Sequence, residues 1–179
     1  MAQFSRVMSL PGYFYLTALA IGIVSFLIAL FSQHVLGMAP CAWCVFQRLI
    51  LLGACFFALL AYVFHQKTYP KSTLVMGFLF VFSALAGIVS AWHQYSVAAN
   101  QFSCSLTFAD KAITQLGLDK ALPKVFGIYA SCMDAKVSLL GLDYALWAFN
   151  LFIILSAIGV AALWLQYRQL ISNPPRRPS

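Results

Sequence analysis

The sequence predicts an all-α membrane protein in which four transmembrane helices form a bundle. Of its 179 residues, 63% are apolar in type and 8% are charged, whereas an ordinary globular domain has about 45–50% apolar and about 25% charged residues. Four apolar runs are each long enough to cross a hydrocarbon layer of about 30 Å as a helix. Because these runs occupy so much of the chain, we expect a single integral membrane domain over residues 1–179 and no separate soluble catalytic domain.

The first predicted span covers residues 13–31. This run is longer than the apolar core of a secretory signal, which has about 7–15 residues, and no small-residue cleavage site follows it, so we expect it to remain as a helix. The second span covers residues 44–64, the third 74–92 and the fourth 144–165. An even number of crossings places both ends of the chain on the same side.

The distribution of charge predicts the orientation in the membrane. The connection 94–142 and the aspartate that follows it contain four lysines and four aspartates, which cancel. The two tails, 1–12 and 166–179, and the turn between the second and third spans contain no acidic residue and carry the basic residues Arg6, Lys67, Lys71, Arg168, Arg176 and Arg177. The positive-inside rule therefore places both tails in the cytoplasm and the connections 33–43 and 94–142 outside. The net charge of +7 thus reflects topology, and we expect no nucleic-acid partner.

Four of the five cysteines lie in the outward connections, where an oxidising compartment permits disulfides. Cys41 and Cys44 end the first connection, and Cys104 and Cys132 lie in the second. For Cys104 and Cys132, a structural disulfide and a functional one both remain open, because long loops gain stability from a crosslink. Cys55, inside the second span, is expected to be a small buried apolar residue.

The Cys41-x-x-Cys44 motif favours redox chemistry over a structural role. A disulfide across so few residues restrains the unfolded chain very little. A closed zinc site needs four ligands, and the sequence has no second Cys-x-x-Cys or histidine pair, so we expect no metal. At the start of the second span, the helix dipole and the unpaired backbone N–H groups favour the thiolate, which is the reactive form of cysteine.

Arg48 lies one helical turn after Cys44, about 5–6 Å away between Cβ atoms, if both are helical. Its guanidinium could stabilise a Cys44 thiolate and an oxyanion on a bound small molecule. Alternatively, Arg48 could be an interfacial arginine that extends to lipid headgroups. Gln47 provides a second polar group on this side.

A dithiol that is oxidised repeatedly needs a two-electron acceptor, and the sequence contains no haem, flavin or nucleotide-binding motif. A lipid-soluble quinone fits a reactive pair at the membrane surface. His93, at the outer end of the third span, could donate a hydrogen bond or a proton to a quinone oxygen. The alternative for His93 is a structural histidine at the interface.

These features together resemble the DsbB family, the disulfide bond formation proteins of the bacterial inner membrane. The likeness covers nearly the whole chain and includes the order of the four spans. Gln47 is a departure, since a well-known member has an acidic residue there. The residues that carry the likeness are Pro40-Cys41-x-x-Cys44, Gln47-Arg48, His93, Cys104, the run 118–126, Cys132 and the run 140–142 followed by Trp147.

The resemblance implies a path for electrons. A Cys104–Cys132 disulfide would oxidise a soluble periplasmic oxidase of the thioredoxin fold, similar to DsbA, with Cys104 forming the mixed disulfide. Electrons would pass through Cys132 to Cys41, and Cys44 would become a thiolate beside the quinone, ubiquinone or menaquinone, with Arg48 holding both. The quinol would return to the respiratory chain. In bacteria, DsbA, DsbB and quinone together form the route that keeps the periplasm oxidising.

The resemblance also implies where the long connection lies. It would be a periplasmic loop carrying a short amphipathic helix over residues 109–122, which lies on the membrane and brings the loop cysteines toward Cys41. Pro123 would end that helix.

Three other functions remain open. The chain could be a specialised paralogue that serves a dedicated partner, or a non-enzymatic four-helix membrane protein stapled by two disulfides. The quinone reductases related to vitamin K epoxide reductase also combine four helices with a Cys-x-x-Cys motif. They place the quinone-facing motif late in the chain, whereas Cys41 and Cys44 come early.

Overall fold

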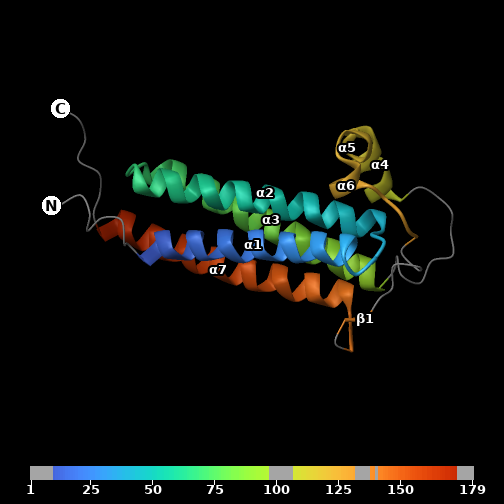
Figure 1. The fold of residues 1–179 in the computed structure, drawn as a ribbon. Coiled ribbons are helices and arrows are strands. Elements are labelled where there is room, and N and C mark those ends of the chain that lie inside the picture. Colours follow the sequence, from blue (N-terminus) through green and yellow to red (C-terminus); the bar gives the residue numbers. More distant parts are fainter. Residues whose placement is uncertain (1–9, 97–106, 132–137, 140, 173–179) are drawn as a thin grey trace.

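The computed structural model describes residues 10–96, 107–131, 138–139 and 141–172. Each predicted span lies inside one long helix, and the four helices run side by side in an elongated bundle (Figure 1). All four are long and apolar enough to cross a membrane. They are α1 (Leu10–His34), α2 (Ala42–Gln66), α3 (Pro70–Ser96) and α7 (Tyr144–Ser172). The chain is therefore a multi-pass membrane protein with an all-α fold.

Local signals account for the helix ends. Gly37 adopts a left-handed conformation, with φ of +67°, which turns the chain after α1 so that the Met38 N–H donates to the Ser32 carbonyl at 3.1 Å. Pro70 occupies the first position of α3, where a missing N–H costs nothing. The helices extend beyond the predicted apolar runs, and α7 continues to Ser172. Part of the predicted C-terminal tail is thus helical.

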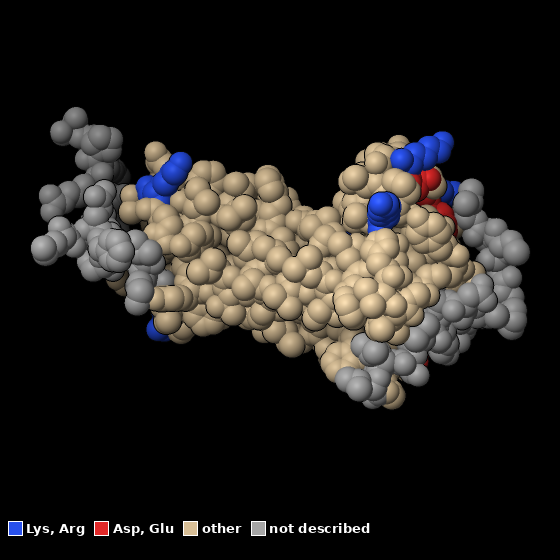
Figure 2. Space-filling view, in the orientation of Figure 1, with Lys and Arg blue, Asp and Glu red and all other residues tan. Residues whose placement is uncertain are grey.

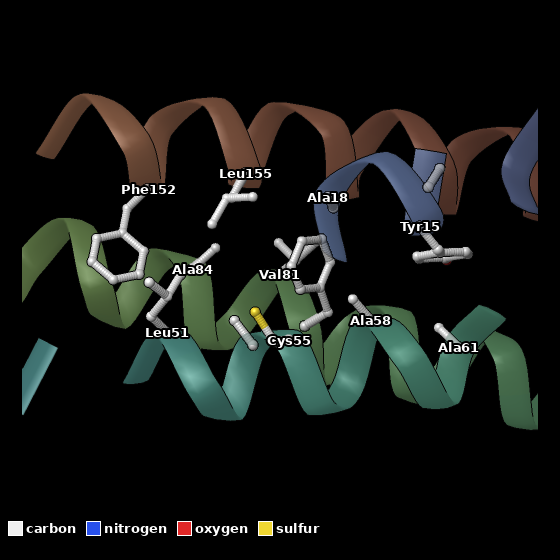
Figure 3. Close-up of a cluster of buried hydrophobic side chains, with 13 residues drawn as sticks. Tyr15, Ala18, Leu51, Cys55, Ala58, Ala61, Val81, Ala84, Phe152 and Leu155 are labelled. Carbon is white, nitrogen blue, oxygen red and sulfur yellow. The ribbon is translucent and has the colours of Figure 1, made fainter. Parts of the chain in front are cut away.

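The helices pack in the order α1, α2, α3 and α7 around the bundle, since each contacts the next and α7 returns to α1. The core between them combines small residues with a few large ones, and Figure 3 shows Phe152 and Leu155 of α7 pointing toward α2 and α3. Close approach depends on glycine at Gly87 of α3, where a Cβ atom would lie 2.3 Å from the Phe152 ring. This contact sets how α3 faces α7.

Charge is confined to the two ends of the bundle on the face seen in Figure 2, and the middle of that face carries none among the described residues. Large apolar side chains are exposed along all four long helices, as expected of a surface that faces lipid. The first residues of α1 and the last of α7 lie at one end, and the three short helices α4, α5 and α6 lie at the other (Figure 1). This arrangement agrees with an even number of crossings. Which end is cytoplasmic remains a prediction.

The segment expected to form one helix over residues 109–122 is divided. It forms α4 (Phe108–Gln115) and α5 (Leu118–Ala121), because Gly117 between them has a left-handed φ of +66°. Pro123 begins α6 (Pro123–Phe126) instead of only ending a helix. Beyond these, β1 (Ser138–Leu139) pairs with β2 (Leu142–Asp143) in a short antiparallel hairpin before α7.

The short helices pack on the end of α2 that carries the cysteine motif. Ile113 of α4 and Phe126 of α6 are buried against Val45 of α2. A reciprocal capping box between Thr107 and Asp110 begins α4. The apolar face of α4 thus covers protein, and its location on the membrane surface remains a prediction.

Candidate functional site

The Cys41-x-x-Cys44 motif lies at the N-terminus of α2, as expected. Cys41 is the N-cap residue, and its sulfur accepts a hydrogen bond from the Cys44 backbone N–H at 3.4 Å. The two sulfur atoms are 3.0 Å apart. This is the arrangement of a dithiol whose sulfurs need little movement to form a disulfide, and the orientation of the N–H groups favours negative charge on sulfur.

The two cysteines differ in exposure. Cys41 is fully buried, with 0% of its surface exposed, and it packs in one cluster with Trp43 and with Ala109 of α4. Cys44 is partly exposed. Attack on the Cys41 sulfur therefore requires that the packing of Ala109 and Trp43 over it opens.

The segment that follows α6 is bonded to the chain on both sides of the connection between α1 and α2. The backbone N–H groups of Tyr129 and Ala130 donate to the Pro40 carbonyl at 3.1 and 3.3 Å. The His34 Nε2 atom lies 2.9 Å from the carbonyl oxygen of Lys124. These contacts connect the end of α1 and the start of α2 to α6 and the segment that follows it.

Arg48 is buried, which the sequence left open. Its Nη1 donates to the Gln33 side chain and, at 3.0 Å, to the Val125 carbonyl, and its Nη2 donates to the Ala29 carbonyl at 3.2 Å. With 7% of its surface exposed, the guanidinium is bound by protein. The alternative of an arginine that extends to lipid headgroups does not describe this geometry.

Cys44 and Arg48 share a cleft of about 440 Å³ between α1, α2 and α7. Its walls are mainly apolar. Tyr144, the first residue of α7, also lines the cleft, and sequence reasoning did not identify it. The lining includes Gln47, Ile28, Ala29, Leu51, Trp147 and Leu151.

Gln94 of α3 is a polar residue that contacts both cysteines, and sequence reasoning missed it. Its Nε2 donates to the Cys44 sulfur at 3.1 Å and to the Cys41 sulfur at 3.6 Å. Its Oε1 accepts a hydrogen bond from Gln47 Nε2 at 2.7 Å. One signal was present in the sequence: Gly87, Ser90 and Gln94 recur at the spacing of one helix face, and all three are buried.

His93 is not among the residues that line the cleft, and its hydrogen bond to a quinone oxygen remains a prediction. Its side chain is exposed, and its ring lies on the indole of Trp43 with centroids 4.6 Å apart. Successive residues of a helix differ by about 100° in direction, so the face that presents Gln94 to the cysteines turns His93 away. Cys104 and Cys132 lie outside the described residues.

Comparisons with known proteins show which family the chain resembles. The family model of disulfide bond formation protein DsbB matches residues 12–163. Disulfide bond formation protein B 1 of Pseudomonas entomophila (strain L48) is 34% identical over 142 residues, which cover 79% of this chain and 83% of that protein. Disulfide bond formation protein B of Ralstonia nicotianae (strain ATCC BAA-1114 / GMI1000) is 32% identical over 154 residues, 85% of this chain and 92% of that protein.

Proposed function

The chain belongs to the DsbB family of disulfide bond formation proteins, and on this basis we propose that it reoxidises a soluble periplasmic oxidase of the thioredoxin fold that resembles DsbA. As a member of this family, the protein is a membrane oxidoreductase that acts in disulfide bond formation. The partner and the electron acceptor, a membrane quinone such as ubiquinone or menaquinone, are our proposal.

The observation that carries the proposal is the cleft shared by Cys44 and Arg48. Its volume of about 440 Å³ falls within the range of small-molecule sites, which is about 300–1,000 Å³. Its apolar walls suit a ring system. Ile28, Trp147 and Ile154 of this lining are exposed on the outside of the bundle. The cleft is therefore accessible from the surface that faces lipid, where quinones dissolve.

The Arg48 guanidinium has N–H donors that could bind such a ligand. Within the part of the chain that the structure describes, its bonds to Gln33, Val125 and Ala29 use three of the five guanidinium N–H groups. The other two could donate to a quinone oxygen. When bound, the quinone supplies a two-electron acceptor beside the Cys44 sulfur.

The proposed relay begins with the loop cysteines. A thiolate of the partner attacks Cys104, forms a mixed disulfide and releases the Cys132 thiolate. Cys132 attacks Cys41, which breaks the Cys41–Cys44 bond and leaves its electron pair on Cys44. The second partner thiol then releases the oxidised partner from Cys104, and Cys104 reforms its bond to Cys132 and frees Cys41. Cys41 and Cys44 close again as two electrons and two protons pass to the acceptor.

Potentials support this direction. A partner with the reduction potential of DsbA, about −120 mV, can be reoxidised only by a strong acceptor. A glutathione-like pool with a reduction potential of about −200 mV would drive the exchange backward. A quinone pool meets the requirement.

We also propose the orientation that the charges predict. Both termini and the turn with Lys67 and Lys71 would lie in the cytoplasm, and the cysteine motif, α4, α5 and α6 would lie in the periplasm, with the protein in the bacterial inner membrane. Arg168 lies toward the C-terminal end of α7, the end that this proposal places on the cytoplasmic side.

The test of the function mixes purified protein, a reduced DsbA-like partner and ubiquinone, and follows the quinone absorbance and the thiols of the partner together. We expect one quinone to be reduced for each partner dithiol oxidised. If both stay unchanged, the proposed function is lost.

A cysteine variant separates the relay from a stapled structural protein. Cys104→Ala should abolish oxidation of the partner, while Cys41 and Cys44, once reduced by a small dithiol, should still reduce quinone. If all four outward cysteines can be replaced with a loss of stability alone, the disulfides are structural and the relay is wrong.

A further inference from the structure

We propose that Gln94 is a catalytic residue, whose amide N–H stabilises the thiolate that forms on Cys44, and that Gln47 is a positioning residue that fixes the direction of this amide. The inference rests on the proposed function, because it assigns a role to Gln94 in the same exchange. A glutamine does not by itself indicate this chemistry in a sequence.

The geometry defines which end of the Gln94 amide meets sulfur. Gln47 Nε2 donates to Gln94 Oε1 at 2.7 Å, so the carbonyl end of Gln94 is engaged on the side of α2. Its NH₂ group is then directed at the sulfurs, 3.1 Å from Cys44 and 3.6 Å from Cys41. An amide turned the other way would place a carbonyl oxygen against sulfur and would repel a thiolate.

Burial strengthens the contact. Gln94 and Gln47 have 5% and 7% of their surfaces exposed, so water competes little for these hydrogen bonds. A hydrogen bond to a charged acceptor is worth more than one to a neutral acceptor, and more still where the local dielectric is low. The contact therefore stabilises the thiolate of Cys44 more than its thiol.

The thiolate forms at a defined step of the exchange. When an attacking thiolate bonds to the Cys41 sulfur, the Cys41–Cys44 bond breaks and its electron pair stays on Cys44. Charge is conserved, since one thiolate is consumed and one is formed. Gln94 is in contact with both sulfurs, so its N–H can follow the charge to Cys44.

Gln94 acts on sulfur from the side opposite to the acceptor. It comes from α3, whereas the cleft is lined by α1, α2 and α7, and Gln94 is not among its lining residues. We therefore expect its replacement to alter the reactivity of Cys44 and to leave quinone affinity unchanged.

The experiment measures the rate at which iodoacetamide alkylates Cys44 in the reduced full-length protein, across a range of pH, with the modified peptide quantified by mass spectrometry. The ionisable groups that act on Cys44 among the described residues are Cys41, Arg48 and Tyr144, and all three are kept. We expect Gln94→Leu to slow alkylation at pH 7 about tenfold and to move the midpoint of the pH profile upward by about one unit.

A second variant distinguishes loss of the N–H donor from disturbed packing. Gln94→Glu keeps the size of the side chain and still accepts the hydrogen bond from Gln47, but it offers no N–H to sulfur and adds a negative charge. We expect it to slow alkylation at least as much as Gln94→Leu. Rates equal to wild type in both variants would overturn the proposal.

Gln166 provides a matched control. It is also 5% exposed, and it is hydrogen-bonded to His65 Nδ1 at 2.8 Å. It belongs to α7 and lies far along the bundle from Cys44. Gln166→Leu should leave the alkylation of Cys44 unchanged. If it slows alkylation as much as Gln94→Leu does, the effect comes from weakened packing, and the proposed role is wrong.

A double-mutant cycle tests the role of Gln47. If Gln47 acts only by orienting Gln94, then Gln47→Leu slows alkylation in the wild-type background and adds nothing to Gln94→Leu. A further slowing in the double variant would overturn the positioning role. Because alkylation needs neither quinone nor partner, a failure of quinone reduction in the wild-type protein would remove the proposed function and leave this result standing.

Discussion

Arg48 Nη1 donates a hydrogen bond of 3.0 Å to the carbonyl oxygen of Val125, which joins the start of α2 to the last turn of α6. The same guanidinium binds the end of α1 through Gln33 and Ala29. One side chain thus connects α6, two long helices and the cleft beside Cys44. We therefore expect changes at Arg48 to affect ligand binding in this cleft.

Arg48→Ala should weaken the use of quinone without altering exchange at the loop cysteines. We expect the quinone concentration for half-maximal rate to rise about tenfold or more, because a charge-assisted hydrogen bond is lost. Formation of the mixed disulfide with the partner should keep its wild-type rate. Arg168→Ala, which removes an arginine stacked on Trp164 elsewhere in the protein, is the control. An unchanged half-saturating concentration in Arg48→Ala would contradict the assigned role.

Thr107→Val should loosen α4. The Thr107 hydroxyl accepts from the Asp110 N–H at 3.3 Å, and removing such a cap costs about 1 kcal/mol. We expect faster hydrogen exchange of the amides in α4 and no change in α3. Thr114→Val is the control in the same helix, because the Thr114 hydroxyl bonds to the carbonyl of Asp110 at 2.7 Å and takes no part in the N-terminal cap. Equal exchange in both variants would show that the capping box does not hold α4.

Gly22→Ala should destabilise the contact between α1 and α2, because its Cβ atom would lie 2.4 Å from the Cys55 sulfur. Overpacking of this kind costs about 1–3 kcal/mol. Cys55→Ala should restore most of the loss, measured as the free energy of unfolding in detergent, and should leave quinone reduction intact. Gly53→Ala is the control, since among the described residues no atom beyond its two chain neighbours and the adjacent backbone of α2 lies within 4 Å of its added Cβ. A loss that Cys55→Ala does not repair would place the strain elsewhere.

Cysteines introduced at Thr68 and Thr114 test the orientation. Both positions are exposed, one in the turn between α2 and α3 and the other on α4. In spheroplasts, in a background without native cysteines, a membrane-impermeant maleimide should label Thr114→Cys at once and Thr68→Cys only after the membrane is opened. The reverse pattern would invert the proposed topology.

Much of the site could be predicted from the sequence because its signals are local. The Cys41-x-x-Cys44 spacing, followed by an apolar run, places the motif at a helix start, and the structure has Cys41 as the N-cap of α2. The partners of Arg48 could not be predicted, since Ala29 and Val125 bind it through backbone carbonyls. Backbone carbonyls have no residue signature. The break at Gly117 was also missed, because glycine is permitted to be left-handed but not required to be.

The sequence by itself determined that this chain is a four-helix membrane protein with a dithiol at the start of its second span. Helix length, apolar composition and a cysteine spacing are properties of contiguous residues, so they need no knowledge of packing. Only the tertiary structure decided that Gln94, and not the neighbouring His93, faces the cysteines. That choice depends on the rotation of α3 about its own axis. The fit of Gly87 against the Phe152 ring of α7 is one contact that sets this rotation, and it joins residues far apart in the chain.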